Sequence, residues 1–503
     1  MRILTAQQTR EAEAVAFEKY STEAQLMLAA GTQCFHAMQK KYGKALEKAV
    51  VAVVCGNGKN AGDGFVMARL LHEKCGCSVT VILADKAPTI AEPLQYFQAM
   101  GEEVLVKQLE SIDSIDADFI VDCIFGIGFH GEARPPFDRA FQLVNDSRAK
   151  VVAVDIPSGV NADDGSVGHI CVQADLTVAV STLKYGHVLP PGNAFCGEVR
   201  VVDIGIPQDC YSGDYAFTSS SRDIRRLFRP RSKNANKGTF GHQLNICSSR
   251  NMTGAGILCA RGALRSGVGL LKCAFPKSCY PAYAANLPEA LMLPLSENEH
   301  KTLSIGCINA LEQTLDWADS IVLGCGLDIN EDTQVIVSTV LKDAKCPVIL
   351  DADGINILSA GIDLLEHIST PFVLTPHPGE MARLAGISIA EVQADRIGTA
   401  KRMAQKTGAV VVLKGANTVV TDGERVYINM TGNPGMAKAG MGDLLAGMIG
   451  AFAAQKMDLF AAAQAAVYIH GLCGDITARE LSQRGMTVSD MAQLLGALMS
   501  EFE

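Results

Sequence analysis

The alternation of short apolar runs with helical segments constrains the fold of this chain more than any other feature. After a helical start over residues 1–45, apolar runs rich in β-branched residues recur, with helical patterns between several of them. Runs that are apolar at every position are typical of parallel strands covered on both faces. In the first half these runs lie at residues 50–55, 79–83, 119–123, 151–155, 176–180 and 198–203. They predict an α/β domain with a parallel sheet.

The second half restarts the same pattern, which predicts a second α/β domain. A polar stretch at residues 208–223 and a basic run at 225–237 separate the two series. We place the boundary near residues 215–225 and predict domains 1–215 and 225–503. The stretch from 208 to 237 is either a flexible tether or an ordered strap. The later apolar runs lie at residues 243–247, 270–274, 320–323, 348–351, 372–375, 410–414 and 418–421.

Composition narrows the class of protein. A chain of 503 residues that is 48% hydrophobic can bury large cores, and a net charge of −10 without a basic tract argues against nucleic acid as a partner. The start resembles no signal peptide, and the longest apolar run, near residues 444–454, is too short to span a bilayer. The 16 cysteines therefore indicate reduced, buried thiols. We expect a cytoplasmic protein that binds neither nucleic acid nor membrane and assembles as a homo-oligomer.

A glycine-rich turn in the second half runs directly into an acidic residue and an apolar helix. Gly440, Gly442 and Asp443 belong to this Gly-Met-Gly-Asp turn. Backbone N–H groups at such a turn, with the positive end of a helix behind them, bind anions. An aspartate beside the anion can move a proton, and this pairing suits phosphoryl transfer to or from a small molecule. The alternative is a structural turn with an N-capping aspartate.

Glycines and polar side chains also follow strands of the first half, where ligands bind in parallel sheets. Residues 56–64 (GNGKNAGDG) follow one strand and precede a helix that we expect to begin near Phe65. Asn60, Asp122 and Ser158 offer hard oxygens from neighbouring strand ends, which suit a monovalent cation at least as well as Mg²⁺. The alternatives are a tight structural turn and ordinary loop caps.

Three further side chains of the first half are candidates for chemistry. Lys184 follows another strand and could pair with phosphate or tune an acid, unless it is solvated. His130 and His187 could act as bases. A lone histidine on a loop is, however, more often incidental.

In their order, four motifs of the first half resemble the YjeF amino-terminal domain, an NAD(P)HX epimerase with a Rossmann-like three-layer αβα fold. They are GNGKNAGDG, VDCIFGIGFHG (121–131), VDIPSG (154–159) and LKYG (183–186), and the resemblance covers residues 1–215. It implies that Asp155 acts as acid/base on the hydrated nicotinamide and that Lys184 supports it. It also implies a K⁺ site at Asn60, Asp122 and Ser158.

The same resemblance implies an NAD(P)HX-binding set in the first half. Its members are Lys59, Asn60, Ala61, Gly62, Asp63, Gly126, Ile127, Gly128, Phe129, His130, Gly131 and Asp155. The family's loop reads closer to GNGNNGGDG, so Lys59 and Ala61 are departures. If the backbone at Ala61 needs a positive φ, alanine costs energy there.

Strand ends of the second half carry a second series of polar segments. Asp351 and Asp353 are expected on one face at a strand end, and His377 and Glu380 could form a polar patch. A lysine followed by backbone amides at residues 414–418 suits nucleotide phosphates. Several such clusters, closed by the Gly-Met-Gly-Asp turn, predict one ligand site across the sheet.

Taken together, the motifs of residues 225–500 resemble the YjeF carboxy-terminal domain, an ADP- or ATP-dependent NAD(P)HX dehydratase with a ribokinase-like αβα fold. They are KGTFGH, MTGAG, ALRSGVGL, LGCGL, LDADGIN, LTPHPGE, VLKGANT and GMAKAGMGDLLAG. The resemblance implies NAD(P)HX contacts at Ala255, Gly326, His377 and Asp443. It implies nucleotide contacts at Lys414, Gly415, Ala416, Asn417, Thr418 and Gly442. Cys325 stands where the family's proline is expected.

These observations predict a two-domain repair enzyme. The first domain would equilibrate the epimers of NADHX and NADPHX, and the second would dehydrate the S epimer with ADP, giving AMP and phosphate. ATP is the alternative donor, Mg²⁺ is expected with the nucleotide, and ADP is favoured because fused chains of this family look bacterial or archaeal. One alternative is a ribokinase-like vitamin kinase. Another is that the first half is a non-catalytic cofactor-binding module.

Overall fold

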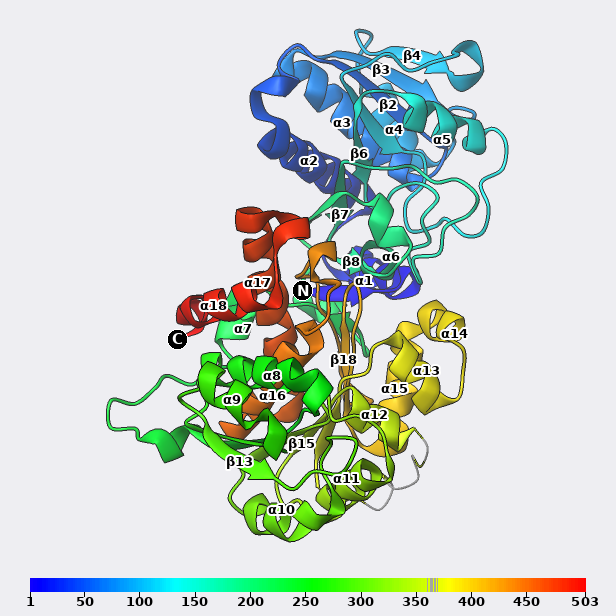
Figure 1. The fold of residues 1–503 in the computed structure, drawn as a ribbon. Coiled ribbons are helices and arrows are strands. Elements are labelled where there is room, and N and C mark those ends of the chain that lie inside the picture. Colours follow the sequence, from blue (N-terminus) through cyan, green and yellow to red (C-terminus); the bar gives the residue numbers. More distant parts are fainter. Residues whose placement is uncertain (360, 362–364, 366–367, 369) are drawn as a thin grey trace. The chain divides into compact units, whose positions relative to one another are not determined.

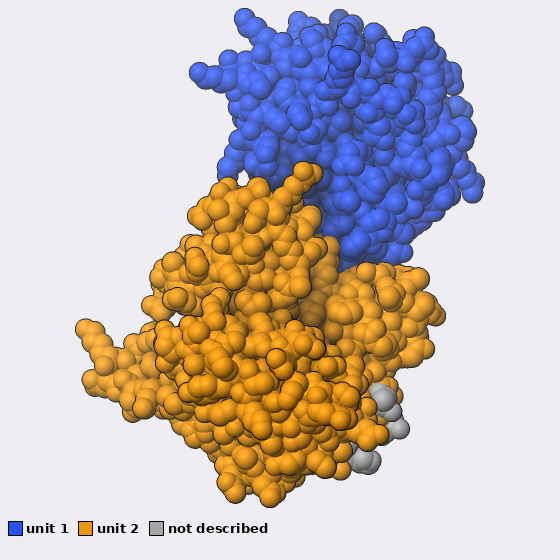
Figure 2. All heavy atoms as spheres, viewed as in Figure 1, with its two compact units in different colours: residues 1–216 blue, residues 217–503 orange. Residues whose placement is uncertain are grey.

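The computed structural model divides into two compact units, residues 1–216 and 217–503 (Figures 1 and 2). It describes residues 1–503 except 360, 362–364, 366–367 and 369.

Unit 1 is built on a seven-stranded sheet in the order β4-β3-β2-β5-β6-β7-β9, and all of its pairs are parallel. The predicted parallel sheet is therefore confirmed. The strands are β2 (Val50–Cys55), β3 (Ser78–Leu83), β4 (Leu105–Gln108), β5 (Phe119–Cys123), β6 (Lys150–Val154), β7 (Leu176–Val180) and β9 (Glu198–Val202). Strand β4 was not expected because all four of its residues are exposed at the sheet edge, so it lacks an apolar run.

Alternate residues of strand β2 pack into two separate hydrophobic cores. Val51, Val53 and Cys55 of β2 pack on the side of α2 and α3, whereas Ala52 and Val54 pack on the side of α5. Side chains of successive strand residues point to opposite faces, so a strand that is apolar at every position requires a helical layer on each face. This is the three-layer αβα arrangement. The helices are α1 (Ala6–Lys19), α2 (Glu23–Tyr42), α3 (Lys59–Cys75), α4 (Ala91–Gln98), α5 (Phe137–Asp146) and α6 (Tyr185–Val188).

Helix α3 begins earlier than expected. It starts at Lys59 rather than near Phe65, so most of the glycine-rich segment is helical. Ala61 does not have a positive φ, and the expected cost of alanine there does not arise. A Cβ added at Gly62 would lie 2.2 Å from Met27 Sδ, so α3 packs closely on α2 there.

The start of the chain is not entirely helical. Arg2–Leu4 forms β1, which pairs in parallel with β8 (Leu183–Lys184). Thr5 and Thr22 cap the starts of α1 and α2, each through a capping box that satisfies the first free amides. Because β1 pairs with the strand that carries Lys184, it places the start of α1 close to the end of that strand.

Unit 2 is built on a sheet that runs β13-β12-β11-β14-β15-β16-β17-β18-β19, parallel up to β17 and antiparallel from β17 to β19. Phe217, at the end of β10 (Ala216–Phe217), pairs with Tyr427 of β19. The strands are β11 (His242–Ile246), β12 (Leu270–Pro276), β13 (Leu291–Leu295), β14 (Ser320–Leu323), β15 (Val348–Leu350), β16 (Phe372–Leu374), β17 (Val410–Leu413), β18 (Val419–Thr421) and β19 (Val426–Ile428). The outer strands β13 and β19 were not expected.

Helices cover this sheet on both sides (Figure 1). Helices α8, α16 and α17 lie on one side of the strands around β18, and α12, α13 and α15 lie on the other. The helices are α7 (Ser221–Arg225), α8 (Thr253–Arg265), α9 (Tyr280–Asn286), α10 (Ile308–Leu315), α11 (Glu331–Asp343), α12 (Asp353–Leu358), α13 (Pro378–Ala385), α14 (Ile389–Ala394), α15 (Arg396–Thr407), α16 (Met441–Ala454), α17 (Leu459–Gly485) and α18 (Val488–Leu498). Helix α17 is long and apolar enough to cross a membrane, but most of its apolar window is buried.

The segment after the unit boundary is anchored to unit 2. Ile224 of α7 is buried in the same core as α16 and α17. Farther along, Arg231 donates to the Gly267 carbonyl (2.6 Å) and lies over the Phe240 ring. These contacts favour an ordered strap over a flexible tether for this part of residues 208–237.

Candidate functional sites

The first candidate site is a cavity of about 370 Å³ in unit 1, at the carboxyl ends of β5 and β6. Lys59, Asn60 and Asp63 reach it from the start of α3. Other walls come from the loop after β5 and from α1 and α2. These further lining residues include Arg10, Glu13, Met27, Gly126, Ile127, Gly128, Asp155 and Lys184.

A buried ion pair lies in this cavity. Lys184 Nζ donates to Asp155 Oδ1 (2.6 Å) and to the Val180 carbonyl (2.7 Å). The Lys184 side chain is 2% exposed and that of Asp155 is 12% exposed. Asp155 also has a φ of +66°, a strained backbone for a non-glycine residue, and such strain is frequent at functional sites. The sequence prediction that Asp155 and Lys184 act together is thus consistent with their direct contact.

His187 holds this pair in place. Its Nδ1 accepts from the Lys184 backbone N–H (2.9 Å), so its Nε2 donates to the Asp155 carbonyl (2.7 Å). Burial, aided by the Lys184 charge, lowers the pKa of His187 to about 4. Both ring nitrogens are occupied and the ring is neutral, so the suggestion that His187 is a base does not fit the structure.

Glu13, Glu23 and Asp63 add three more carboxyl groups to the lining of the same cavity. Burial raises the pKa of Asp63 well above its usual range, and the charges of Asp155 and Glu13 add to this effect. Burial likewise raises the pKa of Glu13. Glu13 and Arg10 were missed in the sequence because α1 was interpreted only by its helical pattern. A usable signal was present: Thr9, Glu13 and Phe17, four residues apart, line the cavity from one helix face.

The three predicted cation ligands come together next to the cavity. Asp122 Oδ1 accepts from Ser158 Oγ (2.6 Å), and its Oδ2 accepts from the Ser158 N–H (2.8 Å). Ser158 Oγ also accepts from the Phe125 N–H (2.9 Å), and Asn60 Nδ2 donates to the Phe125 carbonyl (3.1 Å). Burial raises the pKa of Asp122 to about 6. Among the described residues, no ion pair neutralises this fully buried carboxylate.

Five predicted members of the NAD(P)HX-binding set do not line the cavity. Ala61 and Gly62 are buried within α3. Phe129 is buried in an aromatic cluster with Phe125, while His130 and Gly131 are exposed beyond the cavity wall.

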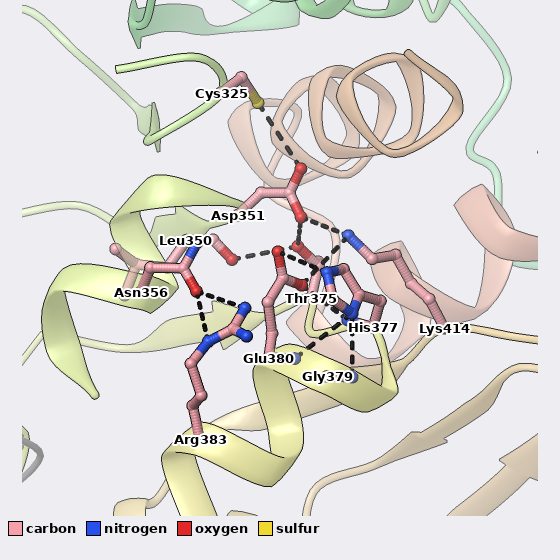
Figure 3. Close-up of polar contacts among 10 residues, drawn as sticks. All are labelled: Cys325, Leu350, Asp351, Asn356, Thr375, His377, Gly379, Glu380, Arg383 and Lys414. Carbon is pink, nitrogen blue, oxygen red and sulfur yellow. Dashed lines mark hydrogen bonds and ion pairs between the residues drawn. The ribbon is translucent and has the colours of Figure 1, made fainter. Parts of the chain in front are cut away.

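The second candidate site lies in unit 2, where the ends of β15, β16 and β17 meet (Figure 3). Lys414 Nζ lies 2.6 Å from Asp351 Oδ1, which also accepts from Thr375 Oγ1 (2.6 Å). Burial opposes the ionisation of both groups. The Lys414 ammonium nevertheless lowers the pKa of Asp351. In turn, the charges of Asp351 and Glu380 raise the pKa of Lys414. The pair is therefore charged.

Asp351 and Asp353 do not share this role, contrary to the expectation from their spacing. Asp353 begins α12, and its Oδ2 accepts from the Asp328 N–H (2.8 Å). The helix starts between the two residues, so the alternation of a strand no longer applies.

His377 and Glu380 form the predicted polar patch at the start of α13. His377 Nδ1 accepts from the N–H groups of Gly379 (3.0 Å) and Glu380 (3.3 Å), and Glu380 Oε2 accepts from the His377 N–H (2.7 Å). Burial lowers the pKa of His377, with the charges of Lys414 and Arg383 adding to the effect. Burial raises the pKa of Glu380 to about 7. The patch is part of a helix cap as well as a wall of the site.

The Gly-Met-Gly-Asp turn meets this site. Gly440 has a φ of +91°, and no side chain caps α16, which begins at Met441. A Cβ added at Gly442 would lie 3.1 Å from Lys414 Nζ. Burial raises the pKa of Asp443 to about 7, and the charge of Asp351 adds to this rise. The turn thus combines a helix start without a side-chain cap and a carboxyl group whose pKa lies near neutral pH.

Two other predicted positions are brought together near the start of α8. A Cβ at Gly326, which has a φ of +66°, would lie 2.8 Å from Ala255 Cβ and 2.9 Å from Met252 Cβ. Only glycine fits there. The start of α8 therefore packs directly against the Gly326 backbone.

Arg396, which was not predicted from the sequence, fixes the backbone of the predicted nucleotide-binding loop. Arg396 is buried in α15 and donates to the carbonyls of Leu413 (3.2 Å) and Lys414 (3.3 Å). Gly415 has a φ of +138°, and Thr418 Oγ1 donates to its carbonyl (3.1 Å). Arg396 belongs to an ordinary amphipathic helix, so no sequence signal marks it.

Three thiols lie under this site. Cys247, Cys259 and Cys325 are fully buried, and Cys325 Sγ donates to Asp351 Oδ2 (3.7 Å). Hydrogen bonds from the Cys259 and Cys325 thiols lower the pKa of Cys247. All 16 cysteines are free, as expected from the sequence, and all but Cys75 are buried.

Comparisons with known proteins agree with this architecture. A family model described as NAD(P)H-hydrate dehydratase matches residues 244–496, and one described as YjeF-related protein N-terminus matches residues 23–186. The chain is 35% identical to a bifunctional NAD(P)H-hydrate repair enzyme of Moorella thermoacetica, over 100% of this chain and 97% of that protein. It is 34% identical to the corresponding enzyme of Coxiella burnetii, over 98% of each.

A solved structure supports the predicted fold of the second half. A ribokinase-like superfamily protein from Enterococcus faecalis is 27% identical, with a TM-score of 0.50, over 57% of this chain and 95% of that one. With the family models, this similarity confirms the predicted pair of α/β folds.

Proposed function

Because the chain belongs to the family of bifunctional NAD(P)H-hydrate repair enzymes, we propose that unit 1 exchanges the R and S epimers of NADHX and NADPHX, and that unit 2 dehydrates the S epimer with ADP as phosphoryl donor. The buried Asp155–Lys184 pair carries the first assignment. The contact of the 440–443 turn with the Asp351–Lys414 pair carries the second.

In unit 1, Asp155 is the proposed acid/base. Lys184 binds its Oδ1, while its Oδ2 lies on the cavity wall, 3.2 Å from the position of a Cβ built on Gly126. The free oxygen can take a proton from the bound hydrate and return it, which epimer exchange requires. Lys184 keeps the Asp155 carboxylate oriented, and His187 fixes the Asp155 backbone by donating to its carbonyl.

Asn60, Asp122 and Ser158 are the proposed K⁺ ligands. Their fit rests on the buried Asp122 carboxylate, which has hydrogen bonds but no positive neighbour among the described residues. The amide, hydroxyl and carbonyl oxygens around it are hard donors, and one carboxylate matches one positive charge. When bound, K⁺ would supply that charge and tie the loop after β5 to the start of α3.

In unit 2, the 440–443 turn is proposed to hold the phosphoryl group during transfer. Asp443 would take the proton of the hydroxyl on carbon 6 while that oxygen attacks the β-phosphorus of ADP, and AMP would leave. Phosphate then departs from carbon 6 while a proton leaves carbon 5, and the carbon–carbon double bond of the dihydronicotinamide is restored. The free amides at the start of α16 and the Lys414 ammonium are placed to stabilise the negative charge.

The proposed nucleotide contacts are those of Lys414, Gly415, Ala416, Asn417, Thr418 and Gly442. Ala255, Gly326, His377 and Asp443 are the proposed contacts of the hydrate. Mg²⁺ would accompany the nucleotide phosphates, as it usually does. ATP is the alternative donor. A homo-oligomeric assembly and a cytoplasmic location stay predictions.

Full-length similarity to repair enzymes favours this function over a vitamin kinase. The test is to mix both NADHX epimers with purified protein and either ADP or ATP, and to follow the near-ultraviolet absorbance of NADH. Complete recovery of NADH requires both activities. Recovery that stops at the S-epimer fraction would contradict epimerase activity, and a stable phosphorylated product would favour the kinase.

A further inference from the structure

We propose that Cys247, Cys259 and Cys325 form a binding site for a thiophilic metal ion such as Zn²⁺ or Cd²⁺, directly beside the carboxylates of unit 2. Their three Sγ atoms all lie within 4.8 Å of one another, and all three side chains are fully buried. Cys247 directly follows β11, Cys259 lies in α8, and Cys325 lies in the turn after β14. Three separate elements therefore direct thiols at one point.

The spacing suits a soft metal ion. In a tetrahedral site with Zn–S bonds of about 2.3 Å, neighbouring sulfurs are about 3.8 Å apart. The observed limit of 4.8 Å needs only a small closure of the thiols. Thiolate sulfur selects Zn²⁺, Cd²⁺ or Cu⁺ over the hard ions Mg²⁺ and K⁺. The site would thus take a different class of metal from the cations proposed above.

Asp443 is the proposed fourth ligand. Oxygen atoms of Asp351 and Asp443 lie within 4.8 Å of Cys325 Sγ and of each other, whereas the Sγ atoms of Cys247 and Cys259 lie beyond that distance from Asp443, so the Asp443 side chain must move toward them to complete the site. Asp351 is already held by Lys414 and Thr375, whereas Asp443 is half-buried and has no ion pair among the described residues.

Charge balance is consistent with this ligand set. Binding of a divalent ion releases the protons of the three thiols to solvent, and the new metal–thiolate bonds replace the S–H bonds. Three thiolates and one carboxylate around a divalent ion leave a net charge of −2, and the Lys414 ammonium lies beside Asp351 to offset part of it. No oxidation or reduction occurs.

The functional consequence is selective inhibition. A metal ion that binds Asp443 removes the proposed base, so dehydration in unit 2 stops. Epimer exchange in unit 1 uses Asp155 and continues. This consequence rests on the proposed function, whereas metal binding by the thiols does not.

The test is a Cd²⁺ titration of the reduced full-length protein, read by the ultraviolet thiolate-to-metal charge-transfer band. We expect one tight equivalent per chain. The band should persist in Cys75→Ser, which removes the one thiol that is not buried and a source of adventitious binding with Cys77. It should also persist in Cys273→Ala, a matched change of a buried β12 thiol outside the cluster. Cys259→Ala should abolish tight binding.

An absent band in the unaltered protein, or an unchanged band in Cys259→Ala, would overturn the proposal. If Cys259→Ala fails to fold, X-ray absorption of the unaltered protein with one Zn²⁺ decides instead. Three sulfurs and one oxygen support the site, and fewer than three sulfurs overturn it.

Activity gives an independent readout. Cd²⁺ should stop dehydration, leave epimer exchange intact, and be reversed by a chelator. Continued dehydration with the three-sulfur site filled would overturn Asp443 as the fourth ligand. If the metal-free protein has no activity, the proposed function fails separately, and the charge-transfer band still tests the metal site.

Discussion

The two sites use an aspartate and a lysine in opposite ways. In unit 1, Lys184 is bonded to Asp155, the proposed acid/base itself. In unit 2, Lys414 is bonded to Asp351, so the proposed base Asp443 has no cationic partner in the described part of the chain. The negative charge of Asp351 instead adds to burial in raising the pKa of Asp443 to about 7. A lysine can therefore fix the orientation of one carboxylate, or it can leave a second carboxylate basic by pairing with its neighbour.

Loss of the unpaired base should give the largest effect. Asp443→Asn is expected to lower kcat/KM of dehydration by about a thousandfold, in the range of general-base contributions. Epimer exchange should be unchanged. Asp353→Asn is the matched control, because that residue serves a loop contact near α12. Equal losses in the two variants would remove the distinction between the sites.

Loss of the paired lysine should affect stability as well as activity. Lys184→Met leaves the Asp155 charge buried and uncompensated, which should destabilise unit 1 by about 3–5 kcal/mol. Hydrogen exchange of unit 1 amides would measure this. Lys150→Met is the control, since its pair with Asp175 is exposed and worth less than about 1 kcal/mol. A similar loss of protection in both variants would speak against the buried pair.

The pH dependence of unit 2 should report Asp443. The base must be ionised, so kcat/KM of dehydration should fall about tenfold per pH unit below its pKa of about 7 and level off above it. Asp351→Asn should move this midpoint to lower pH, because it removes a negative charge that raises the pKa. A rate–pH profile of both proteins tests this. A midpoint that moves upward would contradict the assignment.

A smaller effect is expected from the cation site of unit 1. Replacing K⁺ by a large organic cation should slow epimer exchange a few-fold in the unaltered enzyme, since it leaves Asp122 without its counter-charge. Asp122→Asn should remove the response to K⁺, and dehydration should not respond in either protein. Epimer exchange measured by NMR at constant ionic strength tests this, and a K⁺ response that survives in the variant would exclude Asp122 as a ligand.

The smallest effect concerns Ala61. In α3 this alanine is helical, so Ala61→Gly should destabilise unit 1 by about 0.5–1 kcal/mol. Had the position required a positive φ, glycine would stabilise it instead. Thermal unfolding gives the sign of the change.

The sheets and much of their strand-end chemistry could be predicted from sequence because both depend on local patterns. Continuous apolar runs such as Val50–Cys55 require two covered faces, and Asp155 and Asp443 sit directly beside recognisable turns. The edge strand β4 could not be predicted in this way, since an edge strand needs no apolar run.

Contacts between distant elements account for the rest. Glu13 reaches the unit 1 cavity from α1, and Arg396 holds the nucleotide loop from α15. His187 is identified as a positioning residue only by the partners of its two ring nitrogens. None of these roles has a local signature, because each depends on how two elements pack.

The start of α3 lies in the wall of the unit 1 cavity and has no side-chain cap, so its first backbone amides are free to bind an anion. Lys59, whose side chain is 61% exposed and pairs with Glu23, stands at this helix start, whereas Asp63, Glu13 and Asp155 add carboxyl groups to the same cavity. A pyrophosphate is stabilised by free amides and a lysine and repelled by carboxylates. A dinucleotide is therefore expected to bind with its phosphates at the start of α3 and its damaged ring beside Asp155. Substrate polarity is thus selected before any proton moves.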